Sequence, residues 1–427
     1  MYAIPAAHVQ VTGVFTHTSP LAPYRGNGRP EAIYFLERLI DDAARELGVD
    51  RVELRRKNLI PAAAMPYKTA LTFSYDCGDF EKGLDKALAL ADWPGFPERR
   101  KESEARGKLR GIGISNAIER AAAPGMEYAE VRFDAGGSAT LVVGSKSQGQ
   151  GHETMYRQVA GERLGLAPED LRVVEGDTDA VAYGVGSYGS RTAAIGGSAL
   201  WLAADKIIAK GRRIAAHLLE AAEADVAFAD GRFAIAGTDR GVTIKEVARA
   251  SFAFAKLPKG LEPGLFEHAT FSPVQETFPN GTHVCELEVD PDTGVVSLVK
   301  YTVVDDVGNE INPLTLHGQV IGGIVQGLGQ ILMEQMAYDP ETGQLLTASF
   351  MDYAMPRAGD LCNMEVGHNP VPTKLNPLGV KGAGEAGTVG ALAAAMNAIV
   401  DAIGTKEIEM PTTSEKVWRA LRKHRKI

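Results

Sequence analysis

Apolar residues recur at helical spacing in several separate parts of the chain. Between Glu31 and Leu47 they fall every three or four positions, which predicts an amphipathic helix, and Asp50 is placed to cap a short helix that ends near Lys57. The same spacing predicts further helices at residues 80–91, 152–164, 192–222, 312–333 and 387–402, and one that begins at Thr243. Residues 1–30, 61–79 and 97–109 lack such a pattern, so we expect extended or irregular connections there.

The pattern changes at Gly111 to an alternation of apolar and polar residues. This alternation predicts strands at residues 111–117, 127–134 and 138–143, and two short strands within residues 228–243. The clearest hairpin joins residues 283–290 to 295–304 through the turn sequence Asp-Pro-Asp-Thr-Gly. Because the change of pattern falls at Gly111, we expect two domains, residues 1–110 and residues 111–427.

The composition is that of an ordinary globular protein, with 45% hydrophobic and 23% charged residues. A net charge of -9 and the lack of a basic block argue against a nucleic-acid partner. No apolar run of about 18 residues is present and the first residues do not form a secretion signal, so we expect no transmembrane helix and a cytoplasmic location. Cys77, Cys285 and Cys362 are far apart, which disfavours a disulfide framework, a zinc site or an iron–sulfur site.

Five polar, glycine-bearing segments carry the candidate chemistry. The glutamate loop, NPLGVKGAGEAGTVGA at residues 376–391, contains one acid, Glu385, and runs directly into a predicted helix, as a loop that presents a general base would. The arginine loop, PYRGNGRPEA at residues 23–32, places Arg25 beside exposed backbone, where a guanidinium suits an anion or an oxo group. The other three are the glutamine loop GSKSQGQGHET (residues 144–154), the serine loop GDTDAVAYGVGSYGSRTAAIGGSA (residues 176–199) and the segment HGQVIGGIVQGLGQ (residues 317–330).

Each segment alone also has a structural interpretation. The Gly-Gln pairs are compatible with simple turns, and Arg25 with a helix cap or an ion pair to Glu31. Two matches to GxGxxG, within residues 184–189 and 382–387, lack the preceding buried strand and the acid about 20 positions later, so a nicotinamide site is disfavoured. Together, five loops rich in neutral donors and poor in metal ligands predict a site that holds a large polar cofactor, with any metal bound by the cofactor.

Taken in the order of the chain, the five segments resemble the motifs of the molybdenum-binding large subunit of the xanthine dehydrogenase, aldehyde oxidase and carbon monoxide dehydrogenase superfamily. The resemblance extends over about residues 4–403. It implies an α+β fold of molybdenum-cofactor-binding domains, with mixed sheets and packed helices, in which residues 1–110 are the remainder of the first domain and residues 111–427 the second. It also implies a molybdopterin cytosine dinucleotide cofactor that holds the metal, and partner chains that carry 2Fe–2S clusters and FAD.

The resemblance assigns roles to individual residues. By motif match Glu385 corresponds to the catalytic base, which accepts a proton from the hydroxide on the metal, and Arg25 to an arginine beside the metal ligands and the substrate. No side chain is expected to bind the metal itself. The remaining matches imply cofactor binding by Gly26, Gln148, Gly149, Gln150, Gly151, His152, Ser187, Tyr188, Gly189, Ser190, Arg191, Gln319, Lys381, Gly382 and Gly384.

The chain departs from the family pattern in two respects. Gly26 stands where the carbon monoxide oxidisers carry a copper-binding cysteine, so we expect hydroxylation of an aldehyde or an N-heterocycle instead. Family large subunits are nearly twice as long, and the earlier half contributes a glycine-phenylalanine loop at the metal and part of the dinucleotide wall. We expect that a separate polypeptide supplies this half, that the chain is a fragment, or that the gene is truncated. We expect the surface that this half would cover to be apolar. We expect the complete enzyme to be a dimer of heteromers.

Two other functions remain open at this point. One is a folded but inactive partial cofactor-binding module. The other is a nucleotide-dependent dehydrogenase, which requires that the isolated chain bind NAD.

Overall fold

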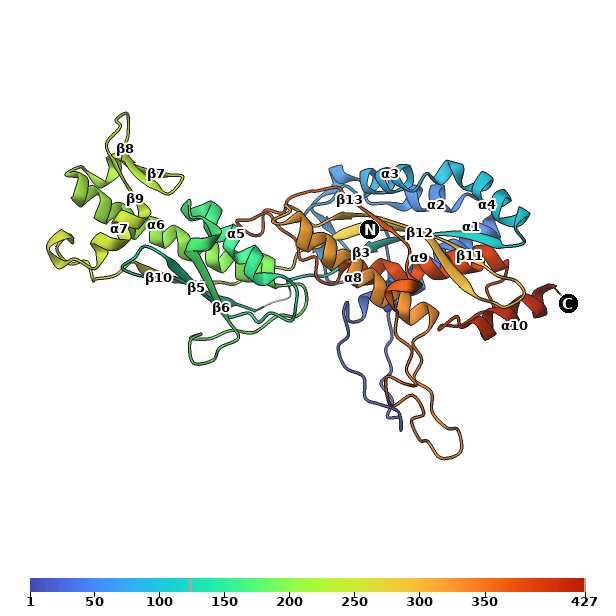
Figure 1. Ribbon diagram of the computed structural model, residues 1–427. Helices are drawn as coiled ribbons and strands as arrows, with labels where there is room; N and C mark the ends of the chain where they lie inside the picture. Colours follow the sequence, from blue (N-terminus) through green and yellow to red (C-terminus); the bar gives the residue numbers. More distant parts are fainter. Residues whose placement is uncertain (123–124, 426–427) are drawn as a thin grey trace.

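The computed structural model describes residues 1–122 and 125–425, which form two lobes (Figure 1). The small lobe, residues 127–271, is drawn in green and yellow, and the large lobe, residues 1–118 and 280–425, in blue, orange and red. Each lobe is built around its own four-stranded sheet and its own apolar core. The predicted domain division at residue 111 falls inside the first strand of the large-lobe sheet and stays a prediction.

The large lobe is a mixed sheet with helices on both faces. The strand order is β13-β12-β11-β3, with β12 and β13 parallel and the other neighbours antiparallel. The strands are β3 (Leu109–Ile118), β11 (Asn280–Val289), β12 (Val296–Asp306) and β13 (Met364–His368). The helices are α1 (Arg29–Leu47), α2 (Arg51–Asn58), α3 (Phe80–Leu90), α4 (Phe96–Ala105), α8 (Pro313–Leu332), α9 (Ala386–Ile403) and α10 (Ser414–Arg425). A two-stranded ribbon pairs β1 (Tyr67–Lys68) with β2 (Ser74–Tyr75).

The small lobe also contains a four-stranded mixed sheet. Its sheet has the order β10-β4-β5-β6, in which β5 and β6 are parallel. The strands are β4 (Glu127–Phe133), β5 (Ala139–Val143), β6 (Leu171–Glu175) and β10 (Phe266–Phe271), and the helices that cover them are α5 (His152–Leu164) and α6 (Gly197–Leu219). At the outer end lie β7 (Val226–Ala229), β8 (Arg232–Ile235), β9 (Gly241–Thr243) and α7 (Ile244–Ser251). Mixed sheets with packed helices confirm the α+β class.

Helix α9 lies directly on strand β3. A Cβ added at Gly111 would stand 2.0 Å from the Ala398 carbonyl oxygen, and one at Gly113 would stand 2.1 Å from that of Ala394. By length and composition α9 is also apolar enough to cross a membrane, contrary to our expectation that no such segment exists, but 89% of it is buried inside the protein. It is therefore the central core helix, and its amino end is fixed by the sheet beneath it.

Most predicted elements are present, but some segments differ from the expectation, and residues 61–79, expected to be irregular, contain the ribbon of β1 and β2. Residues 97–109 were expected to be a connector, but they contain α4 and the start of β3. Only Phe96 and Ser103 of α4 are buried, so its sequence carries no apolar stripe, and Arg99 attaches it to the sheet through Glu286 at 3.0 Å. Residues 228–243 contain parts of three short strands instead of two.

Two extended segments, residues 3–24 and 334–357, project together from the large lobe and are called the arm here (Figure 1). The Ser19 backbone N–H donates to the Tyr338 hydroxyl at 2.8 Å, and that hydroxyl donates to Ser19 Oγ at 3.0 Å. The His17 ring stands edge-on to Tyr338, with centroids 5.8 Å apart. These contacts hold the two segments to each other.

Candidate functional site

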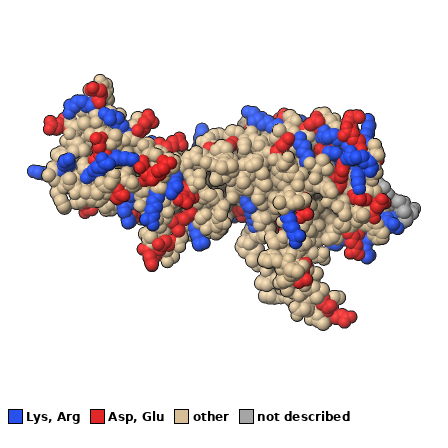
Figure 2. Space-filling view, in the orientation of Figure 1, with Lys and Arg blue, Asp and Glu red and all other residues tan. Residues whose placement is uncertain are grey.

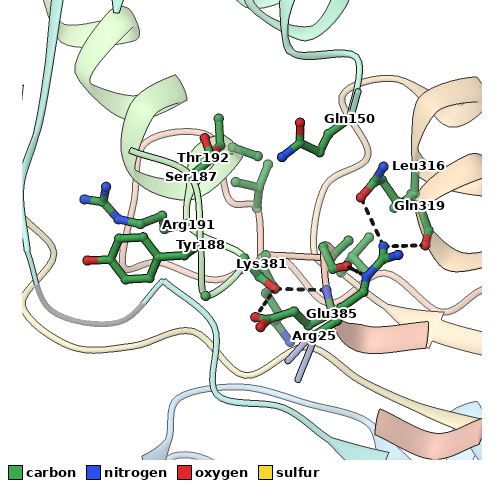
Figure 3. Close-up of a pocket in the computed structure, with 18 of the residues that line it drawn as sticks. Arg25, Gln150, Ser187, Tyr188, Arg191, Thr192, Leu316, Gln319, Lys381 and Glu385 are labelled. Atoms are coloured by element: carbon green, nitrogen blue, oxygen red, sulfur yellow. Dashed lines mark hydrogen bonds between the residues drawn. The ribbon is translucent and has the colours of Figure 1, made fainter. Parts of the chain in front are cut away.

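A cavity of about 1030 Å³ is lined by all five glycine-bearing segments. Figure 3 shows their side chains, including Arg25, Gln150 and Glu385, around one space. Of the residues expected to form the site, the cavity wall contains Arg25, Gln148, Gly149, Gln150, His152, Ser187, Tyr188, Gly189, Ser190, Arg191, Gln319, Lys381, Gly382, Gly384 and Glu385. Gly26 and Gly151 stand just outside it. The Gly26 N–H donates to Glu385 Oε1 at 2.9 Å, and Gly151, with φ of 78°, is the residue before α5.

Glu385 is held in one orientation by donors from two other segments. It directly precedes α9 and does not cap this helix with its side chain. Its Oε1 accepts the Gly26 N–H, and its Oε2 accepts the Ser190 hydroxyl at 2.8 Å. The Glu385 backbone N–H donates in turn to Ser190 Oγ at 3.0 Å (Figure 3). A half-buried carboxylate at the positive end of a long helix, with both oxygens oriented, is suited to accept a proton from a group in the cavity.

Arg25 links the glutamate loop to helix α8. Its Nε donates to the Gly384 carbonyl at 2.5 Å, its Nη1 to Gln326 Oε1 at 3.1 Å and its Nη2 to the Gln319 carbonyl at 2.9 Å. Partial burial lowers the pKa of Arg25, and the charge of Glu385 opposes this effect. Because these hydrogen bonds use most of the donors of the Arg25 guanidinium, its side chain is held in place and contributes a fixed positive charge to the wall.

Two further cations of the wall are neutralised by buried carboxylates. Arg191 Nη1 donates to Glu127 Oε2 at 2.7 Å, and its Nη2 donates to the Met126 carbonyl at 2.8 Å. Lys381 Nζ donates to Asp306 Oδ2 at 2.6 Å, with both side chains almost fully buried. Both cations were expected to bind cofactor, and the structure places them in the wall with their charges paired.

The free donors around the cavity are mostly backbone and neutral side chains. Helix α5 begins at His152, α8 follows its capping residue Asn312, and α9 follows Glu385, and all three residues line the cavity. A π-helical turn that continues into α6 also begins at the wall, at Thr192. Four helical segments thus direct their amino ends toward one space, an arrangement that favours anions such as phosphates.

The glutamine loop forms the rim of the cavity. The Gln148 N–H donates to Gln150 Oε1 at 2.5 Å, and Gln150 Nε2 donates back to Gln148 Oε1 at 2.6 Å. Gly149 lies between them with φ of 104° and open space where a Cβ would stand. His152 behind the rim contacts Glu175 Oε2 at 3.1 Å, which anchors the start of α5.

Sequence reasoning missed several residues of the wall. Asn309 to Leu316 contribute the approach to α8, and the capping sequence Asn312-Pro313 was the signal that could have indicated them. Gln326 was inside a quoted segment but was not singled out. Glu119, at the end of β3, contacts Ser190 from behind the wall, and nothing in its local sequence indicates this position.

No protein-built metal centre is found among the described residues. No group of three or more His, Cys, Asp or Glu side chains in residues 1–122 and 125–425 is arranged to hold a metal ion. None of the cysteines in these residues lines the cavity.

Comparisons with known proteins find similar sequences over almost the whole chain. Two family models described as molybdopterin cofactor-binding domain match residues 86–362 and residues 1–59. The carbon monoxide dehydrogenase large chain of Hydrogenophaga pseudoflava is 37% identical over 446 residues, covering 99% of this chain and 55% of the relative. The nicotine 6-hydroxylase large subunit of Paenarthrobacter nicotinovorans is also 37% identical, covering 98% of this chain and 53% of the relative.

The fold is similar to part of a longer chain of known structure. Quinoline 2-oxidoreductase from Pseudomonas putida 86 matches with a TM-score of 0.88 and 34% identity, covering 94% of this chain and 53% of that chain. The chain therefore spans about half the length of the relatives that it matches.

Proposed function

Since the chain belongs to the molybdopterin cofactor-binding family of xanthine dehydrogenase, aldehyde oxidase and carbon monoxide dehydrogenase large subunits, we propose that it is the cofactor-holding part of a molybdenum hydroxylase. The proposed reaction oxidises an aldehyde or an N-heterocycle with oxygen derived from water. Electrons then pass to partner chains with 2Fe–2S clusters and FAD. The observation that carries the proposal is Glu385, held by Gly26 and Ser190 on the cavity where all five segments meet.

The residues of the cavity fit a large anionic cofactor. Four helical amino ends, the amides of Gln148 and Gln150 and the hydroxyl of Ser187 supply donors without an opposing carboxylate cluster at the rim. Gly149 and Gly189 leave open space where a Cβ would stand, so a ligand could approach the backbone closely. We assign the pterin and its cytosine dinucleotide to these segments. When bound, this cofactor supplies the two-electron redox centre of the reaction.

Glu385 acts as the general base in this proposal. The Gly26 N–H and the Ser190 hydroxyl each donate to one of its oxygens, which keeps the carboxylate in a single rotamer facing the cavity. Arg25 holds the backbone of the preceding residue through the Gly384 carbonyl. General-base assistance of this kind contributes about 10²- to 10⁴-fold to a rate.

The substitution Glu385→Gln tests the role of the base. Gln keeps the size of the side chain and can still accept the Gly26 N–H, so cofactor content should be unchanged. Turnover of an aldehyde or N-heterocycle should fall by at least about 10²-fold. Molybdenum and released pterin are measured on the same preparation, and a loaded variant with near-normal turnover would remove Glu385 from this role.

The substrate class follows from the residue beside Arg25. Gly26 has no side chain, its positive φ of 96° disfavours any other residue, and Pro30 fills the space where a Cβ would lie. A thiol ligand for copper therefore has no place at this position. The names of the nicotine and quinoline enzymes support N-heterocycles as candidate substrates. Copper bound in the purified holoenzyme together with carbon monoxide-dependent dye reduction would overturn this assignment.

The arm supports the proposal that another polypeptide completes the subunit. Residues 1–24 contain no Asp, Glu, Lys or Arg. Phe15 and Leu21 are fully exposed, and Phe350 on the second segment is 84% exposed. Figure 2 shows the arm as a mainly uncharged projection with acidic residues at its tip. An exposed apolar surface of this kind normally marks an interface. We assign it to the polypeptide that corresponds to the other half of the relatives' chain.

Coexpression with a polypeptide that corresponds to this other half tests the arm. Hydrogen exchange in the complex should slow at residues 3–24 and 334–357, and Phe15→Asp with Phe350→Asp should abolish the complex. Phe254→Asp, at an 81% exposed phenylalanine of the small lobe, is the matched control. Protection confined to other surfaces, or a homodimer formed through the arm, would contradict the assignment. The proposed complete assembly is a cytoplasmic dimer of heteromers.

One alternative remains, a folded but inactive partial module. Mass spectrometry of released pterin and molybdenum quantitation separate the two functions. Stoichiometric molybdenum with the cytosine dinucleotide supports the hydroxylase, and the absence of both supports the inactive module.

A further inference from the structure

A second carboxyl group, Glu119, lies directly behind the proposed base. It follows strand β3, and its backbone N–H donates to the Pro279 carbonyl at 2.8 Å, which fixes the residue at the end of the sheet. The side chain is only 2% exposed. Its Oε1 lies 3.4 Å from Ser190 Oγ, the hydroxyl that also donates to Glu385 Oε2 at 2.8 Å. One serine therefore bridges a buried carboxyl group and the carboxylate that faces the cavity.

The second oxygen of Glu119 lacks any stabilising partner in the described structure. Among residues 1–122 and 125–425 no donor lies within hydrogen-bond distance of Oε2. Glu119 and Asp305 both line a small cavity that is too small to hold a water molecule. A buried carboxylate with one bare oxygen is strongly disfavoured, whereas a neutral carboxylic acid at the same place is not.

The charged groups around Glu119 act in opposite directions. Glu385, across Ser190, opposes ionisation of Glu119, while Arg29 favours it and Arg25 is also attracted to both carboxyl groups. Burial, followed by the charge of Glu385, raises the pKa of Glu119 well above its usual range. Two carboxyl groups that share a site cannot both ionise easily, and the more buried member retains the proton.

We propose that Glu119 is a positioning residue that holds one proton in a Glu119–Ser190–Glu385 unit and thereby keeps the Glu385 side chain aligned. In this unit the Glu119 O–H donates toward Ser190 Oγ, and the Ser190 O–H donates to Glu385 Oε2. The serine hydroxyl therefore has a fixed direction, and the negative charge is confined to the carboxylate on the cavity. This inference rests on the proposed role of Glu385 as the base.

The pH dependence of stability tests the proton on Glu119 without cofactor or substrate. A carboxyl group with a raised pKa in the folded state ionises first in the unfolded state, so it destabilises the fold as pH rises above about 4.3. Glu119→Gln cannot ionise. Relative to this variant, the folding equilibrium constant of the wild type should therefore fall about tenfold per pH unit until the pKa of folded Glu119 is reached. Glu169→Gln, at an exposed glutamate of the small lobe, reports the effect of removing a solvated carboxylate.

The measurement is urea unfolding of the purified chain between pH 5 and pH 8. A difference between wild type and Glu119→Gln that does not change with pH, or that favours the wild type at high pH, would overturn the proposal. If Glu119→Gln does not fold, Glu385→Gln gives the same information. Removing the charge that faces Glu119 should shorten the pH interval over which stability is lost, and an unchanged interval would contradict the pairing.

Infrared spectroscopy gives a direct second readout. At pH 7 the wild type should show a protonated carboxyl band that Glu119→Gln lacks, and a spectrum without this difference would overturn the proposal. Neither experiment needs molybdenum. If stability changes with pH as expected but the chain never binds the cofactor, the pairing of Glu119 with Glu385 is supported and the proposed function is refuted. If the cofactor-loaded enzyme needs Glu385 for turnover but the wild type does not lose stability relative to Glu119→Gln as pH rises, only the pairing of Glu119 with Glu385 is refuted.

Discussion

The substitution Lys381→Met separates a structural role of this lysine from a role in cofactor binding. Lys381 Nζ lies 2.6 Å from Asp306 Oδ2, and the side chains are 0% and 1% exposed. Removing one partner of such a pair leaves an uncompensated buried charge, which costs about 3–5 kcal/mol. Asp306 keeps the N–H groups of Gly308 at 2.9 Å and Val371 at 3.0 Å, so we expect the lower end, about 3 kcal/mol.

The loss of stability caused by Lys381→Met should be measurable in the chain without cofactor. Urea unfolding is followed by the fluorescence of Trp93 and Trp418 in the large lobe, in a Trp201→Phe background that silences the small lobe. Adding Asp306→Asn to Lys381→Met removes the buried charge, and the double variant should cost less than the sum of the single variants by about 2 kcal/mol. If Lys381→Met leaves stability without cofactor unchanged and lowers only cofactor content, the structural role assigned here is refuted.

Two other perturbations test the core around the site. Gly113→Val should destabilise the chain by about 3 kcal/mol, because its side chain would meet the α9 backbone 2.1 Å from Cβ, whereas Gly318→Ala, at an open helical position, should be neutral or stabilising in the same unfolding assay. Burial lowers the pKa of His283 to about 3, so the unfolded state binds a proton more readily below about pH 6.5 and stability should fall by about 1.4 kcal/mol per pH unit between that pH and pH 3. His283→Gln should flatten this slope, and an unchanged slope would show that His283 is not its source.

The fold class and the five segments that line the cavity were accessible from sequence because both depend on local patterns. Helix α5 and the hairpin of β11 and β12 have apolar periodicities that identify them without knowledge of their neighbours. The five segments contain glycines and neutral donors in recognisable order, and the structure brings them to one cavity. Helix α4 was missed because charged contacts with the sheet, and not an apolar stripe, hold it in place.

What the sequence could not reveal is the pairing of side chains that are distant along the chain. Arg191 and Lys381 lie in motif loops and were expected to bind cofactor, yet their partners Glu127 and Asp306 are 64 and 75 positions away. Glu119 is equally invisible, because its relation to Glu385 depends on how β3 meets the serine loop. Such pairings follow from tertiary packing, for which no local residue pattern exists.

The paired cations change the physical picture of how the cavity holds an anion. Arg191, Lys381 and Arg120 line the wall, but each is in an ion pair with a carboxylate of the protein. Arg25 and Arg29 also line the wall, and neither is in an ion pair with a carboxylate of the described residues. Attraction for phosphate therefore rests on these two cations, on backbone donors and on the amino ends of helical segments, whose positions are set by the packing of the lobes. Helix α9 shows this dependence most directly, because the glycines of β3 determine how closely it approaches the sheet and Glu385 directly precedes its first turn. Helix α9 therefore both stabilises the core of the large lobe and positions Glu385, the proposed base.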